Sequence, residues 1–369
     1  MSLESTGAQG AEVRGKDSSA KPHTIATISQ IRQLSKINPW LAGFHVVAEW
    51  ILIVAAIWLC KRSWSLPAYV ATVVCIGSRQ HALMILMHDG VHYRLFQNKV
   101  MNDWISEVLL AWPVLVSARA YRSNHLAHHQ YLNTDRDPDW VRRQGDPVWM
   151  FPKRLPDLMA LLIRDLSGIG AIGLLRLIGR LLSKDADVTK QFLLLRYGFY
   201  LAVASLIVWT SSVKLVLLYW FVPLFTWLIF IFRIRSIAEH SAIFGRSKAY
   251  GQTRTTVPSV LERVFIAPKN VSYHLEHHLY PSVPFYRLPK LHAILMARPA
   301  YRDAHITQGY FRVMKECIDD TEAHRRQGKH AGLFRADAEE TSASAACAAK
   351  VPLSVRTSTG RPNSPSRQR

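Results

Sequence analysis

The sequence predicts an all-α integral membrane protein, with four transmembrane helices in two hairpins and a cytoplasmic helical cap that carries clustered histidines. Three observations predict this fold: four apolar blocks approach membrane-spanning length, basic residues gather outside the hairpin turns, and histidines recur in three clusters. The 369 residues carry 46 Lys and Arg against 26 Asp and Glu, a net charge of +20. This charge favours an anionic membrane surface over nucleic acid, because no strip of basic residues interleaves with aromatic ones.

The N-terminal region precedes the first predicted hairpin. Residues 1–38 are mostly polar and contain no apolar core of a signal peptide, so we expect a disordered tail. Apolar blocks at about 41–60 and 67–87 follow, joined by a short turn, and predict the first two spans. The second block carries Arg79 and His81, polar groups that are costly in a bilayer unless they face protein or an aqueous site.

The middle of the chain predicts helices of two kinds. Residues 105–116 are apolar but too short for a confident span, which favours an interfacial or re-entrant helix. Residues 140–190 mix apolar and basic positions, a pattern of helices lying on the membrane surface, although helices packed on a soluble core look similar. Blocks at 192–210 and 214–232, separated by a very short turn, predict the second hairpin.

The distribution of basic residues predicts the topology. Lys and Arg cluster in the N-terminal tail, in 88–190 and in 233–369, whereas the two hairpin turns carry three. The positive-inside rule places those three regions in the cytoplasm, and every histidine cluster then lies on that side. We expect one membrane domain over 39–334, followed by a disordered tail over 335–369 that is rich in Ala, Ser, Thr, Pro and Arg.

Eight histidines form three clusters with helical spacing. In a helix, positions i, i+3 and i+4 share one face, so each cluster presents several neutral imidazoles to a transition metal. The clusters contain neither Cys nor an HExxH signature, which argues against zinc sites of the structural or protease type. Many imidazoles beside an apolar compartment suit iron and O2 chemistry, although zinc or copper would also accept them. The clusters are His88 and His92, then His125, His128 and His129, then His274, His277 and His278.

The series HxxxH, HxxHH and HxxHH, with its spacing around two hairpins, resembles the integral-membrane fatty acid desaturase and hydroxylase superfamily. The runs Arg79–Leu83, Asn133–Asp139 and Ala238–His240 are similar to its bacterial acyl-lipid branch. The resemblance covers about residues 40–310. It implies a pair of irons held by the eight clustered histidines, with His240 after the last span completing the ligand set.

Other residues near the clusters have open roles. His81 precedes His88 by two helical turns and is either a supporting or a core histidine. Ser236 stands where acyl-CoA members of the family have an asparagine. Carboxylates beside the ligands can accept an imidazole N–H and fix its tautomer, a role we expect for one or two of them. The carboxylates are Asp89, Asp135, Asp137, Asp139 and Glu276.

The resemblance implies an O2-dependent desaturase in which two iron ions and O2 convert a carbon–carbon single bond of a fatty acyl or lipid-like substrate into a double bond. The sequence contains no fused cytochrome b5-like, flavin or iron–sulfur segment, so an external electron carrier, ferredoxin- or cytochrome b5-like, is expected on the basic face. The expected location is a bacterial inner membrane, with the active site on the cytoplasmic side.

Three alternatives remain open at the level of sequence. The same scaffold could act as a hydroxylase or ketolase. It could also desaturate a small amphiphilic molecule derived from an amino acid, as in the dihydrorhizobitoxine type of desaturase. A membrane metal-binding or transport protein is a third alternative, but Glu49 alone offers a ligand near a span centre, where a translocation path needs several.

Overall fold

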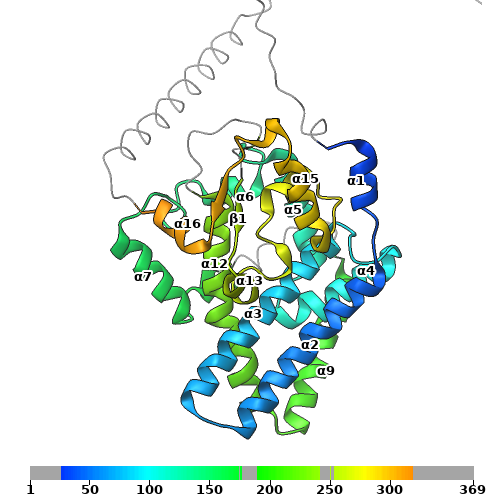
Figure 1. The fold of residues 1–369 in the computed structure, drawn as a ribbon. Helices are drawn as coiled ribbons and strands as arrows, with labels where there is room; N and C mark the ends of the chain where they lie inside the picture. Colours follow the sequence, from blue (N-terminus) through cyan, green and yellow to red (C-terminus); the bar gives the residue numbers. More distant parts are fainter. Residues whose placement is uncertain (1–25, 174, 177–188, 242–249, 251–252, 319–369) are drawn as a thin grey trace, which may run out of the picture. The chain divides into compact units, whose positions relative to one another are not determined.

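The computed structural model describes residues 26–173, 175–176, 189–241, 250 and 253–318 (Figure 1). Most of these residues are helical, and the described part contains four helices long and apolar enough to cross a membrane. The predicted all-α membrane fold is therefore confirmed. Residues 1–25 and 319–369, which include most of the predicted N-terminal tail and all of the predicted C-terminal tail, lie outside the described residues.

The first pair of long helices comprises α2 (Pro39–Arg62) and α3 (Leu66–Val91), which pack along each other. Each begins at a side-chain N-cap, Asn38 or Ser65, with a proline in the first turn, where its missing N–H costs nothing. α2 exposes large apolar side chains along its length, as a lipid-facing helix does, whereas most of α3 is buried. α3 extends past the predicted end of the span, so His88 lies inside its last turn.

The polar residues of these spans face protein. Glu49 is buried between two cations: its Oε2 lies 3.2 Å from Arg79 Nη1 and its Oε1 lies 2.6 Å from Lys269 Nζ. Opposite charges within 4 Å offset part of the cost of burying each of them. Because Lys269 belongs to η5 (Pro268–Asn270), these ion pairs tie the first pair of helices to the segment that leads to the third histidine cluster.

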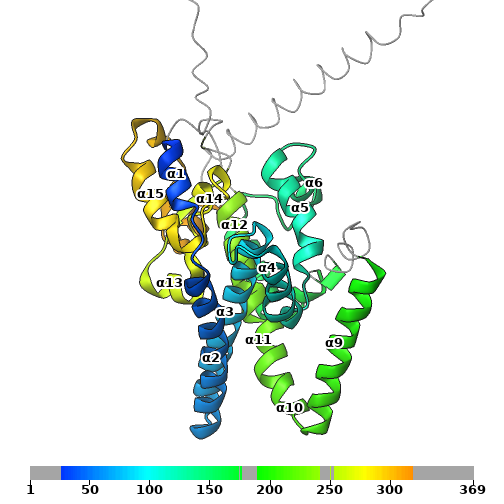
Figure 2. The same ribbon diagram turned by 90° about the vertical axis from the view of Figure 1, so that its right-hand side faces the viewer.

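The second pair consists of α9 (Lys190–Trp209) and a longer helix with two interruptions. Figure 2 shows them meeting at their turn and spreading apart toward their other ends. Pro223 has no N–H to donate one turn back, and the helix widens into a π-turn before it. A second break lies at Thr226 (φ −115°, ψ −85°). The pieces are α10 (Val213–Val216), η4 (Leu217–Phe221), α11 (Val222–Phe225) and α12 (Trp227–His240).

Shorter elements gather at one end of the four long helices (Figure 1). They are α4 (Lys99–Ile105), η2 (Ser106–Ala111), η3 (Trp112–Val114), α5 (Ala118–Tyr131), α6 (Pro138–Arg143), α7 (Leu155–Leu166), β1 (Thr255–Val257), α13 (Val260–Phe265), α14 (His274–Leu279), η6 (Phe285–Arg287), α15 (Leu288–Met296), η7 (Pro299–Tyr301), β2 (Ile306–Gln308) and α16 (Tyr310–Glu316). The segment at 105–116, expected to be one short helix, is a π-helix followed by a 3₁₀ turn.

Two features were not predicted. Residues 26–38 are not disordered: α1 (Ile28–Leu34) begins with a capping box between Thr27 and Gln30. Leu34 of this helix is buried in a cluster with Leu291 and Leu295 of α15, a tertiary contact that average polarity does not reveal. The other feature is a parallel pairing of β1 with β2, two strands of three residues each, which are too short to show a sequence period.

Candidate metal centre

The structure brings all nine predicted ligands together, from four places far apart in the chain. The first cluster ends α3, the second lies on α5, His240 ends α12 and the third occupies α14. Ser117 caps α5 through the Ala120 N–H, and the i, i+3, i+4 spacing then aims all three of its histidines at the centre. Local helix geometry therefore aims the histidines of α5, and long-range packing brings this helix to α3, α12 and α14.

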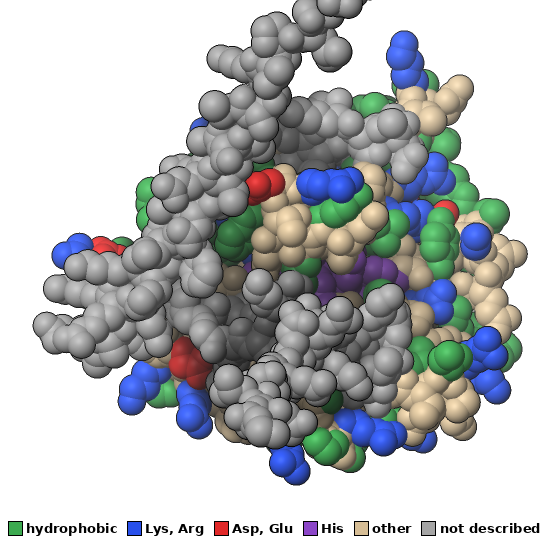
Figure 3. All heavy atoms as spheres, turned by 90° about the horizontal axis from the view of Figure 1, so that it is seen from above, with side chains coloured by type: hydrophobic (Ala, Val, Ile, Leu, Met, Phe, Trp, Pro, Cys, Tyr) green, Lys and Arg blue, Asp and Glu red, His purple; other side chains and the backbone are tan. Residues whose placement is uncertain are grey.

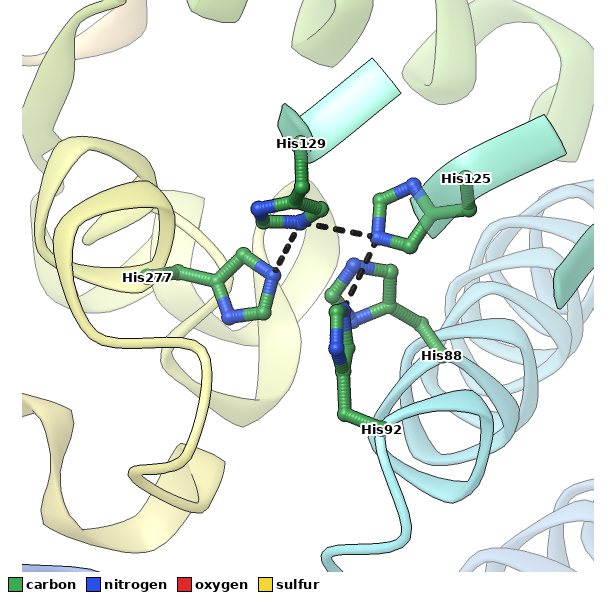
Figure 4. Close-up of side chains that lie close together, drawn as sticks. All are labelled: His88, His92, His125, His129 and His277. Carbon is green, nitrogen blue, oxygen red and sulfur yellow. Dashed lines mark hydrogen bonds between the residues drawn. The ribbon is translucent and has the colours of Figure 1, made fainter. Parts of the chain in front are cut away.

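One group consists of five histidines whose ligand nitrogens all lie within 4.8 Å of one another. Figure 4 shows their rings converging from three elements. The Nε2 atoms of His92 and His125 are 3.0 Å apart, those of His125 and His129 3.1 Å, and those of His129 and His277 3.0 Å. We call these residues the first histidine group: His88, His92, His125, His129 and His277.

The remaining four histidines form the second histidine group: His128, His240, His274 and His278. The Nε2 of His274 lies 2.9 Å from that of His240 and 3.0 Å from that of His278. The ligand nitrogens of His128, His240 and His278 also lie within 4.8 Å of one another. The two groups adjoin, since the rings of His129 and His278 are stacked with centroids 4.1 Å apart.

The spacing of the nitrogens fits a metal ion better than hydrogen bonding among the imidazoles. Neutral imidazole has one N–H and one acceptor, so several Nε2 atoms that meet at one point cannot all be satisfied by each other. For a metal–nitrogen bond of about 2.1 Å, two adjacent ligands of an octahedral ion lie roughly 3.0 Å apart. The spacings of 2.9–3.1 Å in both groups match that value.

Burial keeps these imidazoles neutral, the form that binds metals. Desolvation, with the positive charges of Arg94 and Arg122, lowers the pKa of His92 to about 3. Desolvation, with neighbouring histidines, lowers the pKa of His129 to about 2. The same causes lower the pKa of His277 well below its usual value. Metal binding at neutral pH would therefore displace few protons from the site.

Asp137 is the predicted carboxylate that does contact a ligand. Both of its oxygens lie 3.0 Å from His128 Nδ1, so the ring's Nδ1–H donates to the carboxylate and Nε2 is left for a metal. Asp137 is buried and is also the N-cap of α6, accepting hydrogen bonds from the Asp139 and Trp140 N–H groups. One carboxylate thus orients the imidazole and begins the next helix.

The other predicted carboxylates do not hydrogen-bond to a predicted ligand; Asp139, for example, accepts from Asn124 Nδ2 at 2.9 Å. Asp135 is exposed, and Asp89 accepts the Phe285 N–H while its nearer oxygen stays 3.9 Å from His88 Nδ1. Glu276 was expected beside the histidines, but it points away from them. The i and i+1 positions of a helix face different directions, and Glu276 instead accepts from the Tyr301 hydroxyl at 2.9 Å.

Sequence reasoning missed two supporting residues. Glu239 Oε1 lies 3.6 Å from His274 Nδ1, and Glu239 forms a possible metal group with His240 and His274. Its position next to His240 in the sequence was the available signal. Tyr121, one turn before His125, lies with its hydroxyl 3.0 Å from that ring's Nδ1.

His81 and Ser236, whose roles were open, lie outside both histidine groups. His81 is fully buried, with its Nε2 3.3 Å from Arg235 Nη1, and is therefore a core histidine. Ser236 is buried at the wall of a cavity beside the centre.

That cavity has a volume of about 670 Å³, the size of a small-molecule site. His88, His128 and His240 are among its lining residues, with Met84 and Phe232 contributing apolar surface. Viewed from the end that carries the short elements, histidine side chains are visible in a hollow of the surface (Figure 3). A molecule in the cavity would lie against histidines of both groups.

Comparison with known proteins agrees with this geometry. The family model for fatty acid desaturases matches residues 63–310, a range that includes every histidine of both groups. The chain is also 29% identical to dihydrorhizobitoxine desaturase from Bradyrhizobium elkanii over 283 residues, which cover 73% of this chain and 80% of that protein. The chain is thus an oxidoreductase of the desaturase type, and it belongs to the fatty acid desaturase family.

Proposed function

We propose that this protein is an O2-dependent desaturase that holds two iron ions, one in each histidine group. The observation that carries the proposal is the division of nine buried or half-buried histidines into adjoining groups of five and four, with nitrogen spacings that fit adjacent metal ligands. Imidazole-only sites suit iron, and two adjacent sites suit a reaction that uses both atoms of O2.

The protein's own residues orient the histidine ligands and limit the water around the reacting carbons. When bound, the iron pair would activate O2 so that two hydrogens leave adjacent substrate carbons and, with two external electrons and two protons, O2 leaves as two water molecules. Asp137 holds His128 in one tautomer, and Tyr121 restrains His125. Met87 and Phe232 on the cavity wall limit the water beside the reacting carbons.

The substrate is a fatty acyl or other lipid-like chain, or a small molecule derived from an amino acid. Family membership supports the first class, and the name of the relative from Bradyrhizobium elkanii supports the second. Hydroxylation on the same scaffold is the nearest alternative outcome, because it depends on where the substrate's C–H bonds lie.

The basic side of the protein would face the cytoplasm of a bacterial inner membrane and dock an acidic electron carrier of the ferredoxin or cytochrome b5 kind. The positive-inside distribution of Lys and Arg supports this orientation. The four long apolar helices support insertion in the membrane.

The test combines metal analysis with substrate-dependent O2 uptake. Purified protein should contain about two irons per chain, as the two histidine groups imply, and should consume O2 when given reductant and substrate. Mass spectrometry of lipids and small metabolites from cells with and without the gene would identify the substrate. A metal-binding or transport protein would bind metal without substrate-dependent O2 uptake, and that result would refute the proposal.

A further inference from the structure

The cavity beside the histidine groups has a strongly cationic lining. Six arginines contribute to it, from α6, α7, α12 and the segment after α7, whereas the acidic residues that line it are Asp139, Asp146 and Glu239. Buried or half-buried charges are normally paired. An arginine in the lining that has no carboxylate partner would therefore indicate a binding site for an anion. The arginines are Arg142, Arg143, Arg164, Arg176, Arg233 and Arg235.

Most of these arginines are neutralised or reach solvent. Three pair with a carboxylate at normal distances, while Arg164 is 40% exposed and Arg176 is exposed. The pairs are Arg142 with Asp139 at 2.9 Å, Arg233 with Asp165 at 2.7 Å, and Arg235 with Glu239 at 2.8 Å.

Arg143 differs from the others. Within the described residues it has no carboxylate within 4.0 Å and makes no hydrogen bond, and its Nε atom is buried. Its guanidinium lies over the Trp149 ring, 4.5 Å from the centroid, and Arg233 lies 4.6 Å from the same ring. This stacking holds the planar group in place but satisfies none of its N–H donors.

The energetics favour an anionic partner for Arg143. Burial lowers the pKa of this guanidinium, because desolvation disfavours its charged form. A single negative charge that accepts hydrogen bonds from the guanidinium would relieve that cost. A carboxylate fits best, since its two oxygens match the fork of an arginine and its single charge matches that of Arg143, which among the described residues has no carboxylate partner. A phosphate is usually bound by several donors or charges, and the neighbouring arginines are already paired.

We propose that Arg143 binds a carboxylate of the substrate, and that the substrate is an amphiphile with a free carboxylate and an apolar part. This inference deepens the proposed function and rests on it for the identity of the reaction. The apolar part packs against Met84, Ile229 and Phe232, which line the same cavity.

The size of the cavity limits where the reaction takes place. Arg143 and His240 line the same volume of about 670 Å³, so the carboxylate and the reacting carbons occupy one compartment. The double bond therefore forms in a part of the molecule that shares this compartment with its charged end. A lipid ester, whose carbonyl carries no charge, would leave Arg143 without a partner.

The test measures binding of three soluble probes to the metal-loaded full chain in nanodiscs by calorimetry: octanoate, methyl octanoate and octyl phosphate. Octanoate should bind the unmodified protein at least about 10-fold tighter than its ester, because hydrogen bonds to charged groups contribute this much. Arg143→Gln should weaken octanoate binding by roughly 10- to 100-fold and leave methyl octanoate unchanged.

Arg154→Gln is the matched control, because Arg154 is a surface arginine paired with Asp157 and its side chain is 78% exposed. It should bind all three probes as the unmodified protein does. Equal binding of octanoate and its ester, an equal loss for both in Arg143→Gln, or tighter binding of octyl phosphate would overturn the inference. The comparison of probes on unmodified protein decides the matter even if Arg143→Gln fails to fold.

The outcomes separate this inference from the proposed function. If octanoate binding depends on Arg143 but no substrate supports O2 uptake, the proposed reaction is refuted and the proposed carboxylate site is supported. If substrate-dependent O2 uptake is found but octanoate and methyl octanoate bind equally well, the proposed reaction is supported and the proposed carboxylate site is refuted.

Discussion

Asp137 connects the candidate metal centre to the local fold, which makes Asp137→Asn an informative change. Its Oδ1 accepts the N–H groups of Asp139 (2.9 Å) and Trp140 (3.3 Å), and its Oδ2 accepts that of Asn133 (2.9 Å). Both oxygens face His128 Nδ1 at 3.0 Å. Every polar neighbour is thus a donor, and a carboxylate can accept from all of them at once.

Asparagine keeps the shape of the side chain but replaces one acceptor with a donor. Whichever way the amide is turned, its NH2 faces at least one backbone N–H, and leaving that buried donor unsatisfied costs about 1–3 kcal/mol. Loss of the carboxylate should also weaken metal binding at the second histidine group by about 10- to 100-fold, or roughly 1.4–2.7 kcal/mol. We expect a less stable protein that retains metal in the first group and releases it readily from the second.

The assay is metal content after dialysis against a graded series of chelator concentrations, with thermal unfolding of the metal-free protein in parallel. Asp135→Asn is the control, since Asp135 lies in the same loop and is exposed. The control should match the unmodified protein in both measurements. If Asp137→Asn retains both metals at the same chelator concentrations as the control, Asp137 does not orient His128 and our reading of the centre is wrong.

Three further changes test other parts of the molecule. His128→Ala should abolish activity and lower the bound iron, whereas His324→Ala should change neither, as measured by turnover and metal analysis. Glu49→Gln should lower the stability by about 3–5 kcal/mol, because it leaves two buried cations without a full negative charge, and thermal unfolding in detergent would measure this loss. Gly90→Ala would place a methyl group against the Ser106 hydroxyl and should displace the end of α3. We expect the stability to fall by about 1–3 kcal/mol and the metal content to fall as well. Adding Ser106→Gly should restore the stability and the metal content.

Each of these has a result that contradicts it. Full activity in His128→Ala would remove this residue from the site. Asp157→Asn, at an exposed ion pair, is the control for Glu49→Gln, and equal stability of the two variants would show that the buried charges are not coupled. Native metal content in Gly90→Ala would mean that α3 tolerates the added group without moving its histidines.

The sequence by itself determined the helical membrane fold and the eight clustered histidines, whereas His240 was predicted from the family resemblance because a lone histidine has no spacing pattern. The spans and the clusters depend only on residues that are close together in the sequence. A span needs about 20 apolar residues, and histidines at i, i+3 and i+4 of a helix share one face whatever the rest of the chain does. Asp137 was among the predicted carboxylates for the same reason, since it lies close to His128 along the chain.

Only the tertiary structure decided which carboxylates face the histidines, how the nine histidines divide into two groups, and that Arg143 has no carboxylate partner among the described residues. Glu276 lies between two predicted ligands in the sequence yet points away from them, and Glu239 reaches His274 only because the end of α12 meets the start of α14. Arg143 is one of many basic residues in the sequence. Its lack of a partner follows from distances to carboxylates on other elements, which depend on the packing of the helices and not on any local pattern.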